Sequence, residues 1–82
     1  AGWPVAYTYL DGKIFKIHKA RVYDLDVKER PGKIMVSNRE GIVCCAGKGT
    51  VLLVEVQLEN RRRMSAYDFA NGFRGLVGKT LT

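Results

Sequence analysis

The chain has 82 residues, of which 14 are lysine or arginine and 8 are aspartate or glutamate, so its formal net charge is +6 at pH 7. So short a chain forms one domain with one small core, because it buries only roughly 60 to 65% of its unfolded surface. Its two cysteines are adjacent and no apolar run is long, which excludes a disulfide scaffold and a membrane-spanning segment within these residues.

The chain opens with a predicted β-hairpin. Residues 6–10 are rich in tyrosine and threonine, and Asp11-Gly12 is a strong signal for a two-residue turn. The second strand is expected over residues 13–23.

This second strand changes phase in its middle. Its inward apolar residues are first Phe15 and Ile17, and then Ala20 and Val22. A β-bulge near His18 and Lys19 restores one buried face and bends the strand sharply, as small barrels require.

Two strands flank the next predicted turn. After a charged loop with a Pro-Gly pair, Ile34 and Val36 alternate along a third strand. Residues 38–41 are expected to form a turn, and residues 42–46 a fourth strand.

The fifth strand has the cleanest alternation in the chain. It follows Gly47-Lys48-Gly49, which we interpret as a hairpin turn because the segment lacks Walker spacing and a following helix. Its expected inward residues are Leu52, Val54, Val56 and Leu58, and its outward residues are Glu55, Gln57 and Glu59.

One short helix is predicted near the end of the chain. Ser65 is the expected N-cap, Asp68 is the acidic partner of a capping box, and Gly72 ends the helix. Ala66, Phe69 and Ala70 share its buried side.

These elements predict an all-β fold for residues 1–82 as a single domain. Five to six short strands, one of them sharply bent, favour a small open Greek-key barrel that resembles the oligonucleotide-binding (OB) fold and carries one short C-terminal helix. An SH3-like barrel is the alternative, since both architectures use five strands with short turns.

A run of three arginines precedes the helix. Arg61, Arg62 and Arg63 lie where the helix dipole favours acidic residues, so local stability does not explain them. They are the leading candidates for binding a phosphate, together with the free amides of the helix start. The alternative is an ordinary solvated loop.

A second set of cations follows the bent strand. Its members are Lys13, Lys16, Lys19 and Arg21, with Lys48 in the glycine turn as a further candidate. Because the bulge divides the strand between two faces, we expect only one pair to join the arginine loop. With a net charge of +6, nucleic acid is the first expected partner. An anionic membrane and a basic surface that serves solubility are the alternatives.

Other reactive residues are given structural roles. His18 stands alone, and Cys44-Cys45 lack the second pair that a zinc site needs, so neither catalysis nor a metal is expected. Adjacent cysteines point to opposite faces of a strand, which favours a reducing compartment. Tyrosines 7, 9, 23 and 67 are candidates for stacking on bases, although packing is expected for most.

Three stretches together resemble the C-terminal domain of methionyl-tRNA formyltransferase, with a likeness that extends from Trp3 to Leu81. They are Ala6-Tyr7-Thr8-Tyr9-Leu10-Asp11-Gly12-Lys13 with Lys16-Ile17 and Ala20; Gly47-Lys48-Gly49 with Glu55 and Gln57; and Arg63-Met64-Ser65-Ala66 with Asp68-Phe69 and Gly72. Three positions depart from the family pattern: His18, Ala46 and Asn60. None removes a basic residue, and asparagine tolerates the left-handed turn that glycine usually supplies.

The resemblance implies a two-domain enzyme of which this chain is the smaller part. The missing N-terminal domain would carry the catalytic residues and bind 10-formyltetrahydrofolate, so no cofactor and no catalysis are expected here. This domain would hold initiator tRNA by its phosphate backbone, in a cytoplasmic monomer with no membrane partner. The alternative is a structural domain of a related formyltransferase that acts on a sugar nucleotide or another small amine.

Overall fold

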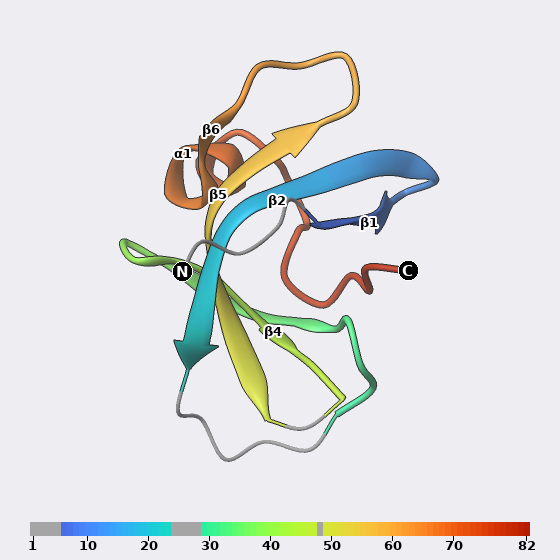
Figure 1. Ribbon diagram of the computed structural model, residues 1–82, viewed down its shortest axis with the longest axis vertical. Coiled ribbons are helices and arrows are strands. Elements are labelled where there is room, and N and C mark those ends of the chain that lie inside the picture. The colour runs from blue at the N-terminus through green and yellow to red at the C-terminus, as the bar shows by residue number, and fades with distance from the viewer. Residues whose placement is uncertain (1–5, 24–28, 48) are drawn as a thin grey trace.

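The computed structural model describes residues 6–23, 29–47 and 49–82. Within these ranges it contains six strands and one short helix (Figure 1). The elements are β1 (Ala6–Leu10), β2 (Lys13–Tyr23), β3 (Ile34–Asn38), β4 (Gly41–Cys45), β5 (Thr50–Leu58), β6 (Met64–Ser65) and α1 (Ala66–Asn71).

All strands belong to one antiparallel sheet with the order β1-β2-β5-β4-β3. β3, β4 and β5 are consecutive neighbours, whereas β2 lies beside β5 and not beside the β3 that follows it. This is the Greek-key arrangement. The short β6 pairs with Glu55 and Val56, in the C-terminal half of β5. The predicted all-β class is confirmed, and β1 and β3 are the two edges of an open sheet.

The first hairpin forms as the sequence predicts. β1 and β2 have the expected bounds, and both turn residues adopt positive φ, 51° at Asp11 and 80° at Gly12. This is a type I′ turn, whose twist matches that of the flanking strands. The turn predicted over residues 38–41 is also confirmed. β4 begins at Gly41, one residue earlier than expected.

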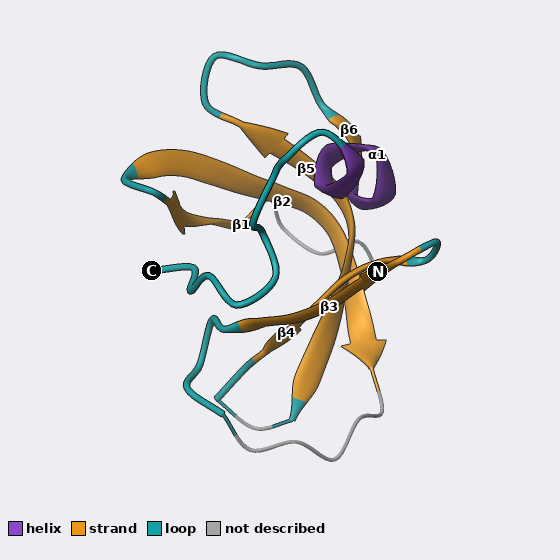
Figure 2. Cartoon of the chain, turned by 180° about the vertical axis from the view of Figure 1, so that it is seen from behind, coloured by secondary structure: helices purple, strands orange, loops and turns teal. Residues whose placement is uncertain are grey.

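The predicted bulge in β2 is present, and a second one lies opposite it. His18 has no partner between the pairs Ile17–Val56 and Lys19–Glu55, and Val54 has none between Glu55 and Leu53. Unpaired residues on both strands bend the sheet in the middle of β2 and β5 (Figure 2).

The predicted alternation along β5 is therefore wrong in its first half. Because the bulge at Val54 shifts the phase, Leu53 joins Val56 and Leu58 in the core, whereas Val54 is only half-buried. Leu52 is buried as expected, but on the opposite face from Val56.

Two other residues that were expected to face inward are exposed. Val36 is 41% exposed because Met35 has no partner in the pairing of β3 with β4, and this bulge turns Val36 away from the face of Ile34. Val22 is 80% exposed, since it lies near the outer end of β2 beyond the last core residue of that strand, Ala20.

The core fills the bend of the sheet and is covered by α1. Phe15 of β2 packs on Phe69 of α1, with ring centroids 5.1 Å apart. Ser65 is the N-cap as predicted, because its side chain accepts a 3.0 Å hydrogen bond from the backbone N–H of Asp68, and Gly72 is the C-cap. The helix buries Ala66 and Phe69 as predicted, while Ala70 is half-buried.

The residues after α1 run between the two edges of the sheet (Figures 1 and 2). The N–H of Gly78 donates to the carbonyl of Ile34, and the N–H of Leu81 donates to the carbonyl of Gly32, each at 2.8 Å. At the other edge, the N–H of Thr82 donates to the carbonyl of Tyr9 at 3.0 Å. We call residues 78–82 the closing segment, because they link β1 with the β3 edge.

Both cysteines are buried free thiols. Burial first, and the neighbouring Cys45 second, raise the pKa of Cys44 from 9.0 to about 11. The folded chain thus retains this proton where the unfolded chain loses it. The stabilisation is complete below pH 9 and is lost as the pH rises toward 11.

We expect the free energy of unfolding to fall by about 1 kcal/mol between pH 8 and pH 10 through Cys44 alone. Denaturant midpoints across this range measure the effect. Replacing Cys44 with alanine removes the titrating group, so the variant should lose this part of the slope. An unchanged slope would show that Cys44 does not titrate as its burial requires.

Candidate nucleic-acid interface

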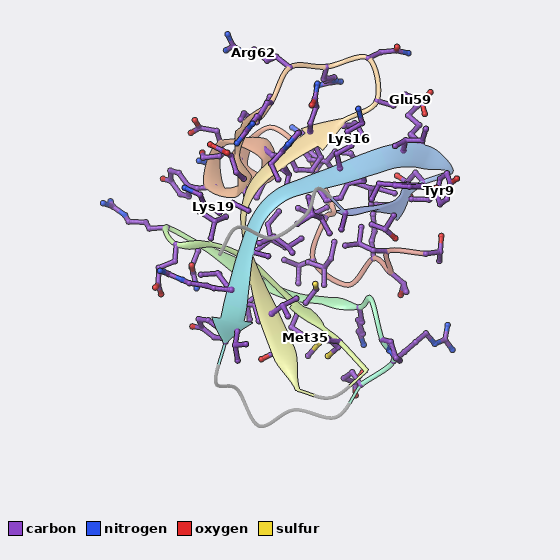
Figure 3. The ribbon with its side chains drawn as sticks, in the orientation of Figure 1. Tyr9, Lys16, Lys19, Met35, Glu59 and Arg62 are labelled. Carbon is purple, nitrogen blue, oxygen red and sulfur yellow. The ribbon has the colours of Figure 1, made fainter. Side chains whose placement is uncertain are left out.

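Two of the predicted lysines lie on the same exposed face of the sheet. Lys16 is directly opposite Gln57, and Lys19 is opposite Glu55. Directly opposed residues in an antiparallel pair share a face. Gln57 and Glu55 are two residues apart on β5, so they lie on the same face of the sheet, and so do the two lysines opposite them. The bulge at His18 brings Lys19 to the face of Lys16. Figure 3 shows both lysines on the same side of the bent β2.

Gln57 connects this face to the arginine loop. Its Nε2 donates to the backbone carbonyl of Arg61 at 2.9 Å, and its Oε1 lies 2.8 Å from Nε2 of His18. Since the amide oxygen only accepts, His18 donates through Nε2 in this arrangement. The loop is further shaped by Asn60, whose φ of 64° is the left-handed turn conformation expected for it. The bulge residue and the loop are thus held together by one side chain.

The three arginines are not equivalent. Arg63 donates through Nε and Nη2 to Oε1 of Glu55, the Nε bond being 2.8 Å long. This hydrogen bond, followed by the charges of Arg63, Lys19 and His18, lowers the pKa of Glu55 against the opposing effect of desolvation. Arg63 therefore carries its charge next to a carboxylate that stays ionised.

Arg61 and Arg62 are exposed on the loop between β5 and β6, and Figure 3 shows Arg62 above Lys16. They line a hollow of about 320 Å³ whose other walls are Met64, Asp68, Phe69, Gly72 and Phe73. In the described part of the chain they form no ion pair, and neither do Lys16 and Lys19. β6 stands between the arginines and α1, and Ser65 already binds an amide of the first turn.

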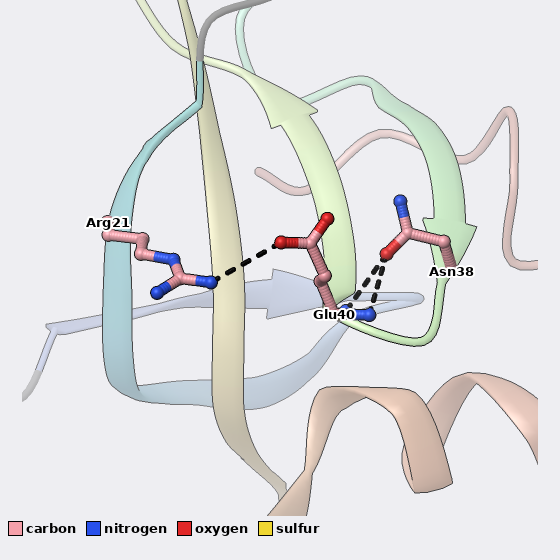
Figure 4. A network of polar contacts seen from close by, with 4 residues as sticks. Arg21, Asn38 and Glu40 are labelled. Carbon is pink, nitrogen blue, oxygen red and sulfur yellow. Dashed lines mark hydrogen bonds and ion pairs between the residues drawn. The ribbon is translucent and has the colours of Figure 1, made fainter.

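Of the remaining predicted cations, Lys13 and Arg21 are among the described residues, and neither joins this group. Lys13 is opposite Leu10 and so belongs to the other face of the hairpin. Arg21 reaches Glu40 at 3.5 Å, and Glu40 in turn donates its N–H to Oδ1 of Asn38 at 2.8 Å (Figure 4). Lys48 lies outside the described residues.

We call Lys16, Lys19, Arg61, Arg62 and Arg63 the basic face. The pairing between β2 and β5 and the Gln57 bridge bring these five cations together. Among the described residues, Glu55, Glu59 and Asp68 are acidic residues near these cations, and Glu55 is engaged by Arg63. A surface of this kind binds phosphates without reading a base sequence.

Two tyrosines border the basic face, and their position was not anticipated. Tyr7 is directly opposite Lys16, and Tyr9 is opposite Ile14, so both rings lie on the face of Lys16. They are 64% and 41% exposed. The alternation Tyr-Thr-Tyr next to a strong turn signal was the available clue.

The described residues offer no group of three or more histidine, cysteine, aspartate or glutamate side chains that could hold a metal ion. In the same residues, no helix is long and apolar enough to span a membrane.

Comparison with known proteins gives a consistent result. Residues 1–74 match the profile of a family described as the formyl transferase C-terminal domain. The methionyl-tRNA formyltransferase of Geobacter sulfurreducens is 43% identical over 72 residues, which are 88% of this chain and 22% of that protein. That of Geobacter metallireducens is 46% identical over the same shares, and that of Methylacidiphilum infernorum is 44% identical over 96% of this chain and 26% of its own length. The chain spans about a quarter of the length of these relatives.

Proposed function

The chain belongs to the formyl transferase C-terminal domain family, and on that premise we propose that it is the tRNA-binding accessory domain of a methionyl-tRNA formyltransferase. In this role it holds the initiator methionyl-tRNA by its phosphate backbone. Catalysis belongs to an N-terminal domain of the same protein, which transfers a formyl group from 10-formyltetrahydrofolate to the amino group of the methionyl residue. The proposed setting is translation initiation in the cytoplasm.

The main support for this proposal is that the five cations of the basic face lie together on one surface. Lys16 and Lys19 come from β2, while the arginines come from a loop some forty positions later, yet the bulge and Gln57 bring them to one surface. Four of the five cations have no carboxylate partner among the described residues. Charges left unpaired in this way are available to phosphates, whereas cations that serve only solubility have no reason to gather.

The contribution to catalysis is positioning. A tRNA held at several phosphates loses its rotational freedom before the chemical step, and a reactant held in the correct orientation reacts faster. Because phosphate contacts carry no base code, the domain supplies affinity and orientation, and selection of the initiator tRNA belongs to other contacts.

We expect tRNA to bind the 82-residue chain with a steep dependence on salt. Three to six phosphate contacts predict a slope of about −3 to −6 in a plot of log affinity against log salt concentration. Titration of tRNA into the chain between 50 and 300 mM salt, followed by fluorescence anisotropy, measures this slope. A flat dependence, or no binding at the lowest salt, would contradict the proposal and favour a structural domain of a formyltransferase with a small-molecule substrate.

A further inference from the structure

The exposed side of the first hairpin carries an aromatic surface that phosphate binding does not use. Tyr7 and Tyr9 point to the same side of β1, and their rings meet edge to face, with centroids 6.1 Å apart and planes at 82°. Tyr7 is nearly two-thirds exposed. A large amphipathic ring left this open on a strand is available to a ligand with a flat apolar face.

The neighbours of this surface indicate the ligand. Lys16 is directly opposite Tyr7, and the Cβ atoms of such a pair are roughly 5 Å apart. Beyond Lys16, the same face continues across β5 to Gln57 and the arginine loop. An aromatic ring beside an unpaired ammonium group suits a molecule that joins a flat ring to a phosphate. A nucleotide has both parts at this spacing.

Double-stranded RNA does not fit this arrangement well. The bases of a helix are stacked on each other, so a protein ring meets their edges and not their faces. An unpaired nucleotide offers a free face, and stacking of that face on an aromatic side chain is how proteins hold single strands. The T-shaped contact with Tyr9 fixes the ring of Tyr7 and lowers the entropy lost on stacking.

We propose that Tyr7 and Tyr9 form a stacking platform for an unpaired base of an RNA strand whose phosphates lie on the basic face. This inference rests on the proposed function, because it extends the same surface from phosphates to a base. It adds a preference for RNA that contains unpaired nucleotides over fully paired RNA with the same number of phosphates on each strand.

The test compares three RNA probes bound to the 82-residue chain. The first is a single-stranded hexanucleotide with 2-aminopurine at its centre, the second is an abasic strand of the same length and charge, and the third is a duplex with six phosphates on each strand. We expect the base-bearing strand to bind roughly 5 to 100 times more tightly than the abasic strand. The fluorescence of 2-aminopurine should be quenched on binding.

Variants locate the effect. Replacing Tyr7 with leucine keeps apolar bulk but removes the ring, and should reduce the ratio between the first two probes to near one. Replacing it with phenylalanine should preserve the ratio. The matched control is Tyr67→Leu, because Tyr67 is 38% exposed on α1 and lies off the hairpin face. This control should behave as the unaltered chain. Circular dichroism verifies that each variant is folded.

The outcomes separate this inference from the proposed function. Equal affinity for base-bearing and abasic strands, or a ratio that survives in Tyr7→Leu, would overturn the stacking platform. If the steep salt dependence with tRNA remains in that case, the phosphate-binding function stands alone. Absence of binding to all three probes and to tRNA would overturn both.

Discussion

A chain in which Arg61 and Arg62 are both replaced by glutamate is expected to bind tRNA roughly 100-fold more weakly at 0.1 M salt. Two lost phosphate contacts account for about 60-fold at this salt concentration, and the two new carboxylates add repulsion. The loss should shrink as salt rises, and the slope against log salt should fall in magnitude by about 2. Titrations at three salt concentrations measure both quantities.

The control for this variant is the replacement of Arg30 and Arg39 by glutamate. Both are exposed arginines outside the strands and outside the basic face, and the net charge changes by the same amount. We expect an effect below about threefold, because neither makes one of the proposed phosphate contacts and salt screens the remaining interaction between exposed charges. An equal loss in both double variants would show that total charge governs binding and not the basic face.

A substitution that should strengthen tRNA binding provides a second check. Replacing Glu55 with glutamine removes the carboxylate that engages Arg63 and leaves every cation in place. Affinity should rise by up to roughly eightfold at 0.1 M salt, the factor for one further phosphate contact. A decrease would mean that Glu55 serves mainly to position Arg63.

The second large effect is expected on stability, from replacing Gly32 with alanine. Gly32 has φ of +90°, and a Cβ built on it would lie 2.1 Å from the backbone oxygen of Leu81. The backbone strain costs about 1 to 3 kcal/mol. Displacing the closing segment also removes several hydrogen bonds worth about 1 kcal/mol each. We expect a loss of about 3 to 5 kcal/mol, out of a total stability of roughly 4 to 12 kcal/mol for a domain of this size.

Gly12→Ala is the matched control. Gly12 also has a positive φ, +80°, but nothing lies within 4 Å of a Cβ built there. Its substitution adds backbone strain without disturbing any packing, so it should cost only about 1 to 2 kcal/mol. Urea denaturation of both variants measures the difference, which isolates the docking of the closing segment. Equal losses would show that this docking contributes nothing.

Much of the sheet could be predicted because its signals are local. The change of phase between Ile17 and Ala20 required a bulge, and the structure places it at His18. The bulge at Val54 gave no such signal, because Leu52, Leu53 and Val54 are all apolar and any of them satisfies an inward position. The same holds for Met35 between two other apolar residues. A phase shift is visible in a sequence only where polar residues mark the alternation.

The composition of the candidate site was predictable, but its internal order was not. All five members of the basic face were named from the sequence, yet the pairing of Arg63 with Glu55 depends on how β6 lies beside β5. The Gln57 bridge likewise depends on the register between β2 and β5. The closing segment lacks any apolar periodicity, so its course along the edges of the sheet could be found only in the structure.

The position of the closing segment affects the order in which the chain folds. The closing segment meets Tyr9 and Gly32, which lie far earlier in the chain, whereas the β1–β2 hairpin and the β3–β4–β5 strands join near neighbours. Contacts between distant residues form after local ones, because a long loop must close first. Until the closing segment docks, the carbonyls of Tyr9, Gly32 and Ile34 lack these hydrogen-bond partners. Unpaired groups on sheet edges are templates for self-association, so we expect docking of the closing segment at Gly32 to reduce aggregation as well as to stabilise the fold.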